Sequence, residues 1–452
     1  MLRTIRLSNC VCIRREENPG FNPAGLTERF TYPNHKFYKN EWLGFSNYGV
    51  RRDICLVELH PDCLVLPRGL IAEILKIYPG AEIIDATVVN PTSFKPSRII
   101  LKDYQRDALT SLLKKNQGVL VAPPGSGKTI ILIELIIRRG QKTLILVHTL
   151  DLLRQWETRF LEFTDIRPGI IQGDLFDVRD VTIATVQSLC RPLPEDFVRQ
   201  FGMVILDEAH HCPASIFQRL VDQFPAPNRN GATATPTRTD GLGFIMTAVL
   251  GPVIHQVENT VLIENGSILK PKIKVVHTKS YFSNVESYQE LLTKITKDEG
   301  RNRLIVDLVT QEAKAGHYCL CLSERVSHVQ ELHRLFSEAN PDTKTFCITG
   351  QDSKEHRQQA IEAMNQGTGN VLFSTKLADE GLDIRRLDRL FLTCPVRAIN
   401  KVTQQIGRIQ RTFPGKKDAF VFDFLDINSL AESQFYTRKR RIYSAYEVEH
   451  IK

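Results

Sequence analysis

The segment from Ala122 to Thr129, APPGSGKT, constrains the fold more than any other part of the sequence. It follows a short apolar run, GVLVAP at 118–123, and leads into an apolar segment of helical period, TIILIELIIRR at 129–139. In a phosphate-binding loop of this kind, Gly125 and Gly127 let the backbone N–H groups curl around an anion at the positive end of the helix. The sequence therefore predicts a nucleotide site in a sheet covered by helices.

The polar residues of this loop have expected roles in binding ATP and Mg²⁺. Lys128 would reach the β and γ phosphates, and the hydroxyl of Thr129 would bind Mg²⁺. A glycine-rich turn of purely structural use shares some of these letters, but it does not need the strand, the lysine, the threonine and the helix in this order. The loop residues expected to bind the nucleotide are Pro124, Gly125, Ser126, Gly127, Lys128 and Thr129.

Two adjacent carboxylates, Asp207 and Glu208, follow the apolar run FGMVIL at 201–206. If that run is a strand of the same sheet, the pair lies at its carboxyl end, where α/β proteins bind their ligands. An acidic pair after a strand is often only the start of a helix, where it meets the positive end of the helix dipole. In a chain with a phosphate loop, we expect Asp207 to hold Mg²⁺ and Glu208 to orient or deprotonate the attacking water.

From residue 100 onward, the chain alternates short apolar runs with longer stretches of helical period. This alternation is typical of a parallel sheet covered by helices. A zone rich in Pro and Gly around 251–271 separates two such series. We therefore expect an α/β fold with two tandem parallel-sheet lobes, at 100–255 and 276–452, joined by a linker at 256–275.

Residues 1–99 form a smaller α+β accessory domain in this prediction. They contain strand-like pieces, a segment rich in Pro and Gly at 18–34 and one expected helix at 67–78. Basic residues alternate there with aromatic ones, a pattern that suits the stacking of bases and the binding of phosphates. A small core built from the same aromatic side chains explains the pattern equally well, so both interpretations stay open.

Composition and charge limit the classes of protein that remain. A chain of 452 residues is expected to form two or three domains. Its formal net charge of +8 is compatible with a polyanionic partner without requiring one. The first residues lack the apolar stretch of a signal peptide, and the longest apolar run, 130–137, is interrupted by Glu134. We expect a cytoplasmic protein with no membrane segment.

The ten cysteines are expected to be reduced and mostly buried, because no paired spacing indicates a disulfide framework. The four cysteines in the first 99 residues could in principle form a metal site. Their spacing fits no zinc pattern. These residues are Cys10, Cys12, Cys55 and Cys63.

Five further segments stand in order along the chain: Leu101-Lys-Asp-Tyr-Gln105, Leu153-Arg-Gln-Trp156, GATATPTRTDG at 231–241, STKLADEGLD at 374–383 and QQIGRIQR at 404–411. Together they resemble the motifs of superfamily 2 helicases, and the Arg-x-Asp-Gly end of the third segment is similar to the XPB/UvsW-type DNA helicases of repair systems and phages. The resemblance covers roughly residues 98–426. It implies two RecA-like lobes, ATP as cofactor and DNA as partner.

The resemblance also implies catalytic residues in the second lobe, namely Gln404, Arg408 and Arg411. The two arginines lie three residues apart, so on a helix they would share one face and approach the γ phosphate together. As arginine fingers they would stabilise charge on the departing phosphoryl group, an effect of about 10³-fold or more on the rate. A pair of basic residues on a helix is otherwise usually a solvated face.

Further roles follow from the same resemblance. Gln105 would recognise adenine, and Gly381 and Asp383 would also contribute to the nucleotide site. Small hydroxyl side chains would hold DNA phosphates without reading the base sequence, although a threonine at a strand end is often only a helix cap. The expected DNA contacts are Thr149, Thr185, Ser323 and Thr375.

The leading functional hypothesis is an ATP-dependent DNA helicase or translocase that acts on forks, junctions, D-loops or R-loops, with 3′–5′ polarity by family analogy. We expect a monomer that works with replication or recombination proteins, in the host cytoplasm if a phage encodes it. Two alternatives stay open: an RNA helicase or duplex translocase without strand separation, and a nucleotide-gated scaffold with little turnover. The basic cluster at 438–441 either touches a duplex or is a solvated helix end.

Overall fold

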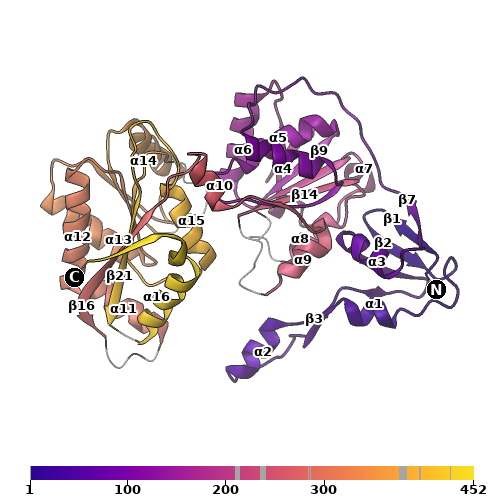
Figure 1. Ribbon diagram of the computed structural model, residues 1–452, viewed down its shortest axis with the longest axis horizontal. Coiled ribbons are helices and arrows are strands. Elements are labelled where there is room, and N and C mark those ends of the chain that lie inside the picture. Colours follow the sequence, from indigo (N-terminus) through magenta and orange to yellow (C-terminus); the bar gives the residue numbers. More distant parts are fainter. Residues whose placement is uncertain are drawn as a thin grey trace. The chain divides into compact units, whose positions relative to one another are not determined.

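The computed structural model contains two compact units, each built around a parallel sheet (Figure 1). The first unit comprises Met1–Pro123 and Gly127–Glu258, and the second comprises Pro124–Ser126 and Asn259–Lys452. The residues that the structure describes are 2–208, 214–234, 241–282, 285, 287–375, 384–396, 399–427 and 429–451.

The first unit holds an eight-stranded sheet in the order β11-β10-β12-β9-β13-β14-β8-β15, parallel except for the β10–β11 pair. Its central strands are buried along their whole length, as expected of a parallel sheet with helices on both faces. The strands are β8 Gln117–Val121, β9 Thr143–Val147, β10 Gly169–Gln172, β11 Leu175–Phe176, β12 Val181–Thr185, β13 Met203–Asp207, β14 Asn228–Thr233 and β15 Val253–Gln256. The helices are α4 Asp103–Leu113, α5 Lys128–Arg139, α6 Leu150–Phe163, η2 Val186–Leu189, α7 Glu195–Val198, α8 Ala214–Val221 and α9 Gly243–Leu250.

The second unit holds a seven-stranded sheet in the order β18-β19-β17-β20-β21-β16-β22, with every pair parallel. Alternate residues of β20 face opposite hydrophobic clusters, Leu390 and Leu392 on one side and Phe391 on the other. The strands are β16 Lys272–Tyr281, β17 Cys319–Leu322, β18 Thr345–Ile348, β19 Val371–Ser374, β20 Arg389–Leu392, β21 Phe420–Ile427 and β22 Glu447–Ile451. The helices are α10 Asn259–Glu264, α11 Tyr288–Lys297, α12 Glu299–Lys314, α13 Val326–Ala339, α14 Lys354–Gln366, α15 Ile399–Ile409, α16 Ser429–Arg441 and η3 Tyr443–Ala445.

A small α+β region forms the start of the first unit. Its five-stranded sheet has the order β5-β6-β2-β1-β7, and β3 and β4 pair separately. The expected helix at 67–78 is present as η1 Arg68–Leu70 followed by α3 Ile71–Ile77. The remaining elements are β1 Thr4–Leu7, β2 Cys10–Arg14, α1 Ala24–Arg29, β3 Thr31–Pro33, α2 His35–Trp42, β4 Asp53–Cys55, β5 Glu58–Leu59, β6 Cys63–Pro67 and β7 Glu82–Asp85.

The predicted fold class is confirmed: two RecA-like parallel-sheet lobes and a small N-terminal α+β region. The expected boundaries at 99, 255 and 275 stay predictions. Among the described helices, none is long and apolar enough to cross a membrane. The cytoplasmic location therefore also stays a prediction.

The N-terminal region and the first lobe share one continuous hydrophobic core, which contains Val11 and Leu66 together with Phe224 and Leu250. Buried arginines connect the two regions from both sides. Arg68 donates to the carbonyls of Ala226 and Pro227, the latter at 2.5 Å, and Arg229 of β14 donates to the carbonyl of Asn9 at 2.6 Å. The N-terminal sheet is therefore packed as part of the first unit.

The expectation that the cysteines are mostly buried is wrong for the described residues. Only Cys319, Cys321 and Cys394 are buried, and the described cysteines are all free thiols. For Cys10 and Cys12 the reason is the N-terminal sheet, because β2 turns Val11 and Ile13 into the core while its cysteines lie on the other, partly open face.

Replacement of Arg68 tests the shared core. Arg68→Met leaves two buried carbonyls without their donor, so we expect the full chain to lose about 1–3 kcal/mol of unfolding free energy. Thermal unfolding followed by circular dichroism measures this loss. Arg14→Met, which removes an exposed arginine of the same sheet, is the matched control and should leave the transition where it is. Equal melting temperatures for the two variants would contradict the prediction.

Candidate nucleotide site and motor residues

The phosphate loop joins the end of β8 to the start of α5. Gly127 precedes the helix with a φ of 79°, and Gly125 has a φ of 84°, both in the region that glycine adopts without strain. An added Cβ at Gly127 would also lie 2.5 Å from Nε2 of Gln105. The loop thus needs glycine at 127 for its backbone and for the side chain packed against it.

Lys128, the first residue of α5, turns back toward the loop. Its ammonium donates to the carbonyl of Ala122 at 3.1 Å and lies 3.5 Å from Oε1 of Glu208. The side chain is largely removed from solvent, so these contacts are formed at reduced dielectric. Thr129 follows in the first turn of the same helix and is half-buried.

Asp207 ends β13 as a fully buried carboxylate that two donors hold. The indole N–H of Trp156 donates to its Oδ2 at 2.8 Å, and the backbone N–H of Glu208 donates to its Oδ1 at 3.0 Å. Burial, reinforced by the charge of Glu208, raises the pKa of Asp207 to about 6, and the ammonium of Lys128 opposes the shift. The arrangement presents a desolvated carboxylate in a fixed orientation.

Glu208 has a φ of 50°, the only positive φ of a residue other than glycine in the described part of the chain. Such a conformation costs about 1–3 kcal/mol and persists where the surrounding structure enforces it. The bond from its own N–H to Asp207 is one such constraint. The residue expected to act on water is therefore also the described residue with a strained backbone.

Gln105 lies beside the loop from α4. Its Oε1 accepts from the N–H of Lys102 at 3.0 Å, and its amide nitrogen faces Gly127. The first unit thus brings together five of the predicted site residues from α4, the loop, α5 and β13. They are Gln105, Gly127, Lys128, Asp207 and Glu208.

Trp156 of α6 is a residue whose role the sequence did not reveal. It was noted only as part of the segment at 153–156. A tryptophan on the apolar face of a helix is ordinarily a core residue, and nothing local indicates that its N–H meets a carboxylate of a distant strand.

In the second lobe, the expectation that Arg408 and Arg411 share one helix face is wrong. Helix α15 ends at Ile409, so Arg408 lies in its last turn and Arg411 lies beyond it. The chain leaves the helix because Arg411 forms a β-bridge with Ile268, next to a bond from the N–H of Leu269 to the carbonyl of Gln410 at 2.7 Å. Gln404 lies on α15, one turn before Arg408.

Lys416 closes the end of this helix. Its ammonium donates to the carbonyls of Leu387, Ile409 and Arg411 at 2.5, 2.6 and 2.7 Å. Three acceptors match the three N–H donors of the charged form, and a cation also suits the negative end of a helix. Burial lowers the pKa of Lys416 to about 7. The lysine therefore holds the backbone between the end of α15 and Arg411.

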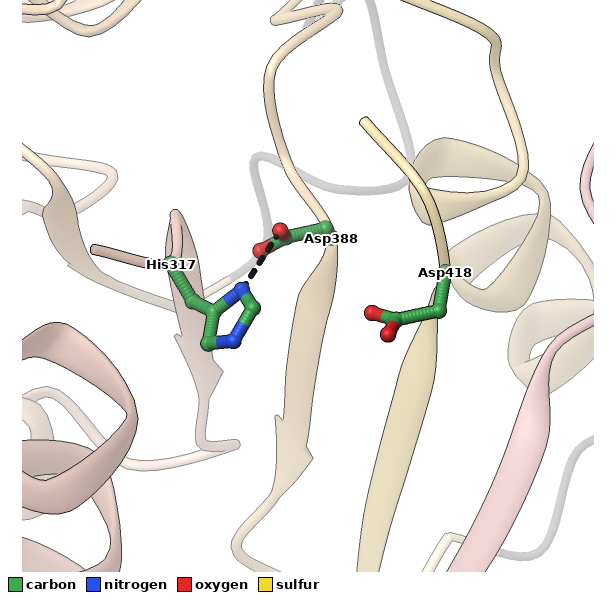
Figure 2. A group of neighbouring side chains, drawn as sticks. All are labelled: His317, Asp388 and Asp418. Atoms are coloured by element: carbon green, nitrogen blue, oxygen red, sulfur yellow. Dashed lines mark hydrogen bonds and ion pairs between the residues drawn. The ribbon is translucent and has the colours of Figure 1, made fainter. Parts of the chain in front are cut away.

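Figure 2 shows His317, Asp388 and Asp418, the one group in the described ranges with metal-ligand spacing. Nδ1 of His317 bonds Asp388 at 2.9 Å. The guanidinium of Arg389 bonds Asp418 at 2.8 Å, His317 at 2.7 Å and Glu312 at 2.5 Å. A protein cation already pairs with these carboxylates. The group lies at the amino ends of strands β17, β20 and β21, the edge opposite to ligand sites in such sheets.

The four hydroxyl residues expected to hold DNA all follow or end sheet strands, and three have side-chain partners within the chain. Thr149 caps α6 by accepting from the N–H of Leu152 at 3.3 Å, and Thr185 bonds Ser188 at 2.7 Å. Thr375 is buried, with 8% of its surface exposed. Their DNA contacts stay predictions.

Ser323 is the least accessible of the four. It is buried, and its hydroxyl bonds Nδ1 of His328 at 2.9 Å. Nε2 of His328 in turn bonds Asn302 at 2.9 Å, and burial lowers the pKa of His328 to about 3, so the imidazole is neutral. This interior network occupies the hydroxyl that was expected to meet a phosphate.

Two further predictions concern other parts of the second lobe. Gly381 and Asp383 lie outside the described residues. Of the basic cluster at 438–441, Arg438 is buried and bonds both oxygens of Asp423 at 2.9 Å, so this one arginine is neither solvated nor open to DNA. Both interpretations stay open for the three exposed residues that follow it.

Lys416→Met tests the closure of α15. Methionine has no N–H to donate, so the three carbonyls lose their hydrogen-bond donor. We therefore expect the unfolding free energy to fall by about 1.5–3 kcal/mol. Lys417→Met, at the exposed neighbouring position, is the control and should have no measurable effect. Thermal unfolding of both variants provides the comparison. A Lys416→Met protein as stable as its control would show that the contacts are dispensable.

Comparison with known proteins agrees with this architecture. A family model described as "Type III restriction enzyme, res subunit" matches residues 98–238, and one described as "Helicase conserved C-terminal domain" matches residues 300–413. A fragment of a putative HsdR subunit of a type I restriction enzyme from Vibrio vulnificus has a TM-score of 0.62 at 18% identity, covering 79% of this chain and 69% of that one. That likeness concerns the fold alone.

Two relatives extend the comparison to sequence. The chain is 27% identical over 357 residues to the "DNA 3'-5' translocase XPB2" of Sulfurisphaera tokodaii, over 71% of this chain and 80% of the relative. It is 33% identical over 303 residues to the "Putative DNA 3'-5' helicase Rad25" of Haloarcula marismortui, over 64% of this chain and 46% of that relative. The chain belongs to the superfamily 2 helicases, with relatives of the XPB type, and is an ATP-dependent DNA helicase.

Proposed function

We propose that the cluster of Lys128, Asp207 and Glu208 hydrolyses ATP and that the helicase uses this energy to remodel branched DNA with 3′–5′ polarity. The observation that carries the chemical part is the contact between Lys128 and Glu208, 3.5 Å apart at the carboxyl end of the sheet. A cation for phosphates and a carboxylate for water stand side by side there, as phosphoryl transfer requires.

The residues present fit a magnesium nucleotide. Thr129 and Asp207 offer a hydroxyl and a carboxylate, the hard oxygen ligands that Mg²⁺ prefers. When bound, the ion neutralises charge on the phosphates. Trp156 holds Asp207 in one orientation through its indole N–H, so the carboxylate that would hold the ion is already oriented.

Lys128 and Glu208 change partners in this proposal. In the structure, the ammonium pairs with Glu208 and with the carbonyl of Ala122. Phosphate oxygens carry more charge than a carbonyl and compete for the same ammonium. Glu208 is then released to accept a proton from the attacking water, from a backbone conformation that is already set.

The second lobe completes the catalytic set in this proposal. Gln404, Arg408 and Arg411 supply polar and positive groups for the γ phosphate, with Gly381 and Asp383 as further nucleotide contacts. Support comes from the motif that they share and from the closure by Lys416, which holds the backbone carbonyl of Arg411. An arginine positioned in this way loses little freedom when it meets a phosphate.

The branched substrate and the polarity rest on other support. Both sequence relatives described above carry "3'-5'" in their names, and the N-terminal sheet shares the core of the first lobe. A rigidly attached N-terminal region would move with the lobe and grip DNA ahead of it. The DNA contacts of Thr149, Thr185 and Thr375, a monomeric state and replication or recombination partners belong to the same proposal.

Steady-state ATP hydrolysis with and without forked DNA tests the chemistry. Glu208→Gln keeps the shape of the side chain and removes the base, so we expect the DNA-stimulated rate to fall about 100-fold or more. Glu195→Gln, an exposed glutamate of α7, is the matched control and should hydrolyse ATP as the wild type does. An ATP hydrolysis rate that changes neither on addition of DNA nor in Glu208→Gln would overturn the proposed site.

Labelled substrates test the branched-DNA proposal. With ATP, the wild type should convert forks and four-way junctions into separated or migrated products, and RNA should stimulate hydrolysis less than DNA. Intact forks and junctions during active hydrolysis would exclude remodelling. Stronger stimulation by RNA would place the substrate in the other class of nucleic acid.

A further inference from the structure

Residues 31–55, which we call the arm, lie outside the nucleotide site. Strands β3 and β4 pair antiparallel and carry α2 and the loop 43–52 at their far end. Figure 1 shows α1, β3 and α2 following one another, with α2 at the end of this projection of the first unit. None of the side chains of α2 is buried.

The aromatic side chains of this region divide into two groups. At the base, Phe30 is fully buried and Tyr32 stacks on Phe244 of α9, with ring centroids 4.1 Å apart. At the tip, Trp42 is 84% exposed, Phe45 64% and Tyr48 97%. Three large aromatic side chains left in water within seven residues indicate a contact surface, because single exposed hydrophobics are common but such a group is not.

Bonds between asparagine side chains and the backbone order the tip, even though its aromatic side chains are exposed. Asn34 accepts from the N–H of Lys36 at 3.1 Å, and its amide donates to the carbonyl of Arg51 at 2.7 Å. The amide of Asn47 donates to the carbonyl of Phe37 at 3.2 Å. The rings are therefore presented from a fixed backbone, which lowers the entropy cost of binding.

The first residue of α2 lies against a motif of the motor. An added Cβ at Gly241, the last residue of the segment 231–241, would lie 2.1 Å from Cδ2 of His35. Gly241 also has a φ of 74°, so glycine suits both its backbone and this contact. The arm starts directly against the lobe that binds ATP.

The charge of the arm indicates which class of molecule binds its tip. The arm contains four basic residues, Lys36, Lys39, Arg51 and Arg52, against two acidic ones, Glu41 and Asp53. The core of a protein–protein interface is depleted of charge, whereas cations around exposed aromatic rings are the combination that binds single-stranded nucleic acid. The rings stack on bases of any type while the cations hold phosphates.

We infer that the tip of the arm binds unpaired DNA, with Trp42, Phe45 and Tyr48 stacking on bases and the basic residues holding the backbone. The inference rests on the proposed action on DNA that has unpaired strands. It assigns a nucleic-acid site to the N-terminal region, on the side of the motor that carries Gly241.

The chain supplies its own probe for this site. It has two tryptophans, and Trp156 is fully buried while Trp42 is exposed. Without ATP, oligothymidylate should quench the emission of the wild type, and Trp42→Phe should lose that quenching while the oligomer still binds. Saturated binding without quenching in the wild type, or equal quenching in Trp42→Phe, would overturn the inference.

Affinity provides an independent measurement. Fluorescence anisotropy with labelled oligothymidylate should show binding weakened by about 10-fold or more when Trp42, Phe45 and Tyr48 are all changed to alanine. Tyr281→Ala, which removes a 70% exposed ring at the end of β16, is the control and should bind as the wild type does. Equal affinities for the two variants would contradict the inference.

The two proposals fail separately. Glu208→Gln should keep the ATP-independent quenching, because the arm does not include the nucleotide cluster. The triple alanine variant should keep its hydrolysis rate in the absence of DNA. Loss of quenching in Glu208→Gln would contradict a separate site on the arm, whereas a failed hydrolysis test alone would leave the arm unaffected.

Discussion

The order of strands in the first lobe is the constraint on which the nucleotide site depends. Strand β14 lies between β8 and β13 in parallel register, so the phosphate loop and the Asp207–Glu208 pair leave the sheet at the same edge, one strand apart. The packing behind them is tight, because an added Cβ at Gly231 would lie 2.4 Å from Leu250. The bond from Trp156 then fixes Asp207 within this frame, and the contact between Lys128 and Glu208 follows.

Charged side chains removed from solvent stabilise each unit in a different way. In the first, Arg68 and Arg229 donate to backbone carbonyls across the junction between the N-terminal sheet and the lobe, so the junction is specified by hydrogen bonds as well as apolar contact. In the second, Arg438 pairs with Asp423, and Lys416 binds the end of α15. Such contacts hold the N-terminal sheet and the end of α15 in defined positions within their own units.

The sequence predicted the local features well. The phosphate loop was recognisable because two glycines, a lysine and a following helix are needed together within eight residues, and the lobes were recognisable because buried strands and helices have different periods. It predicted less about the second lobe. Arg411 was expected on a helix, but the bridge to Ile268 and the bonds from Lys416 end α15 before it. Neither contact leaves a signal in the helical periodicity of the segment 404–411.

What the sequence by itself determined is the chemistry: a phosphate loop, an acidic pair after a strand, and a motif order that identifies the helicase. Only the tertiary structure decided which similar residues serve which purpose. It buried Phe30 and left Trp42 exposed, and it turned Ser323 toward His328. The physical reason is that burial and hydrogen bonding depend on which distant segments meet, and side chains of one type give no local signal of that meeting.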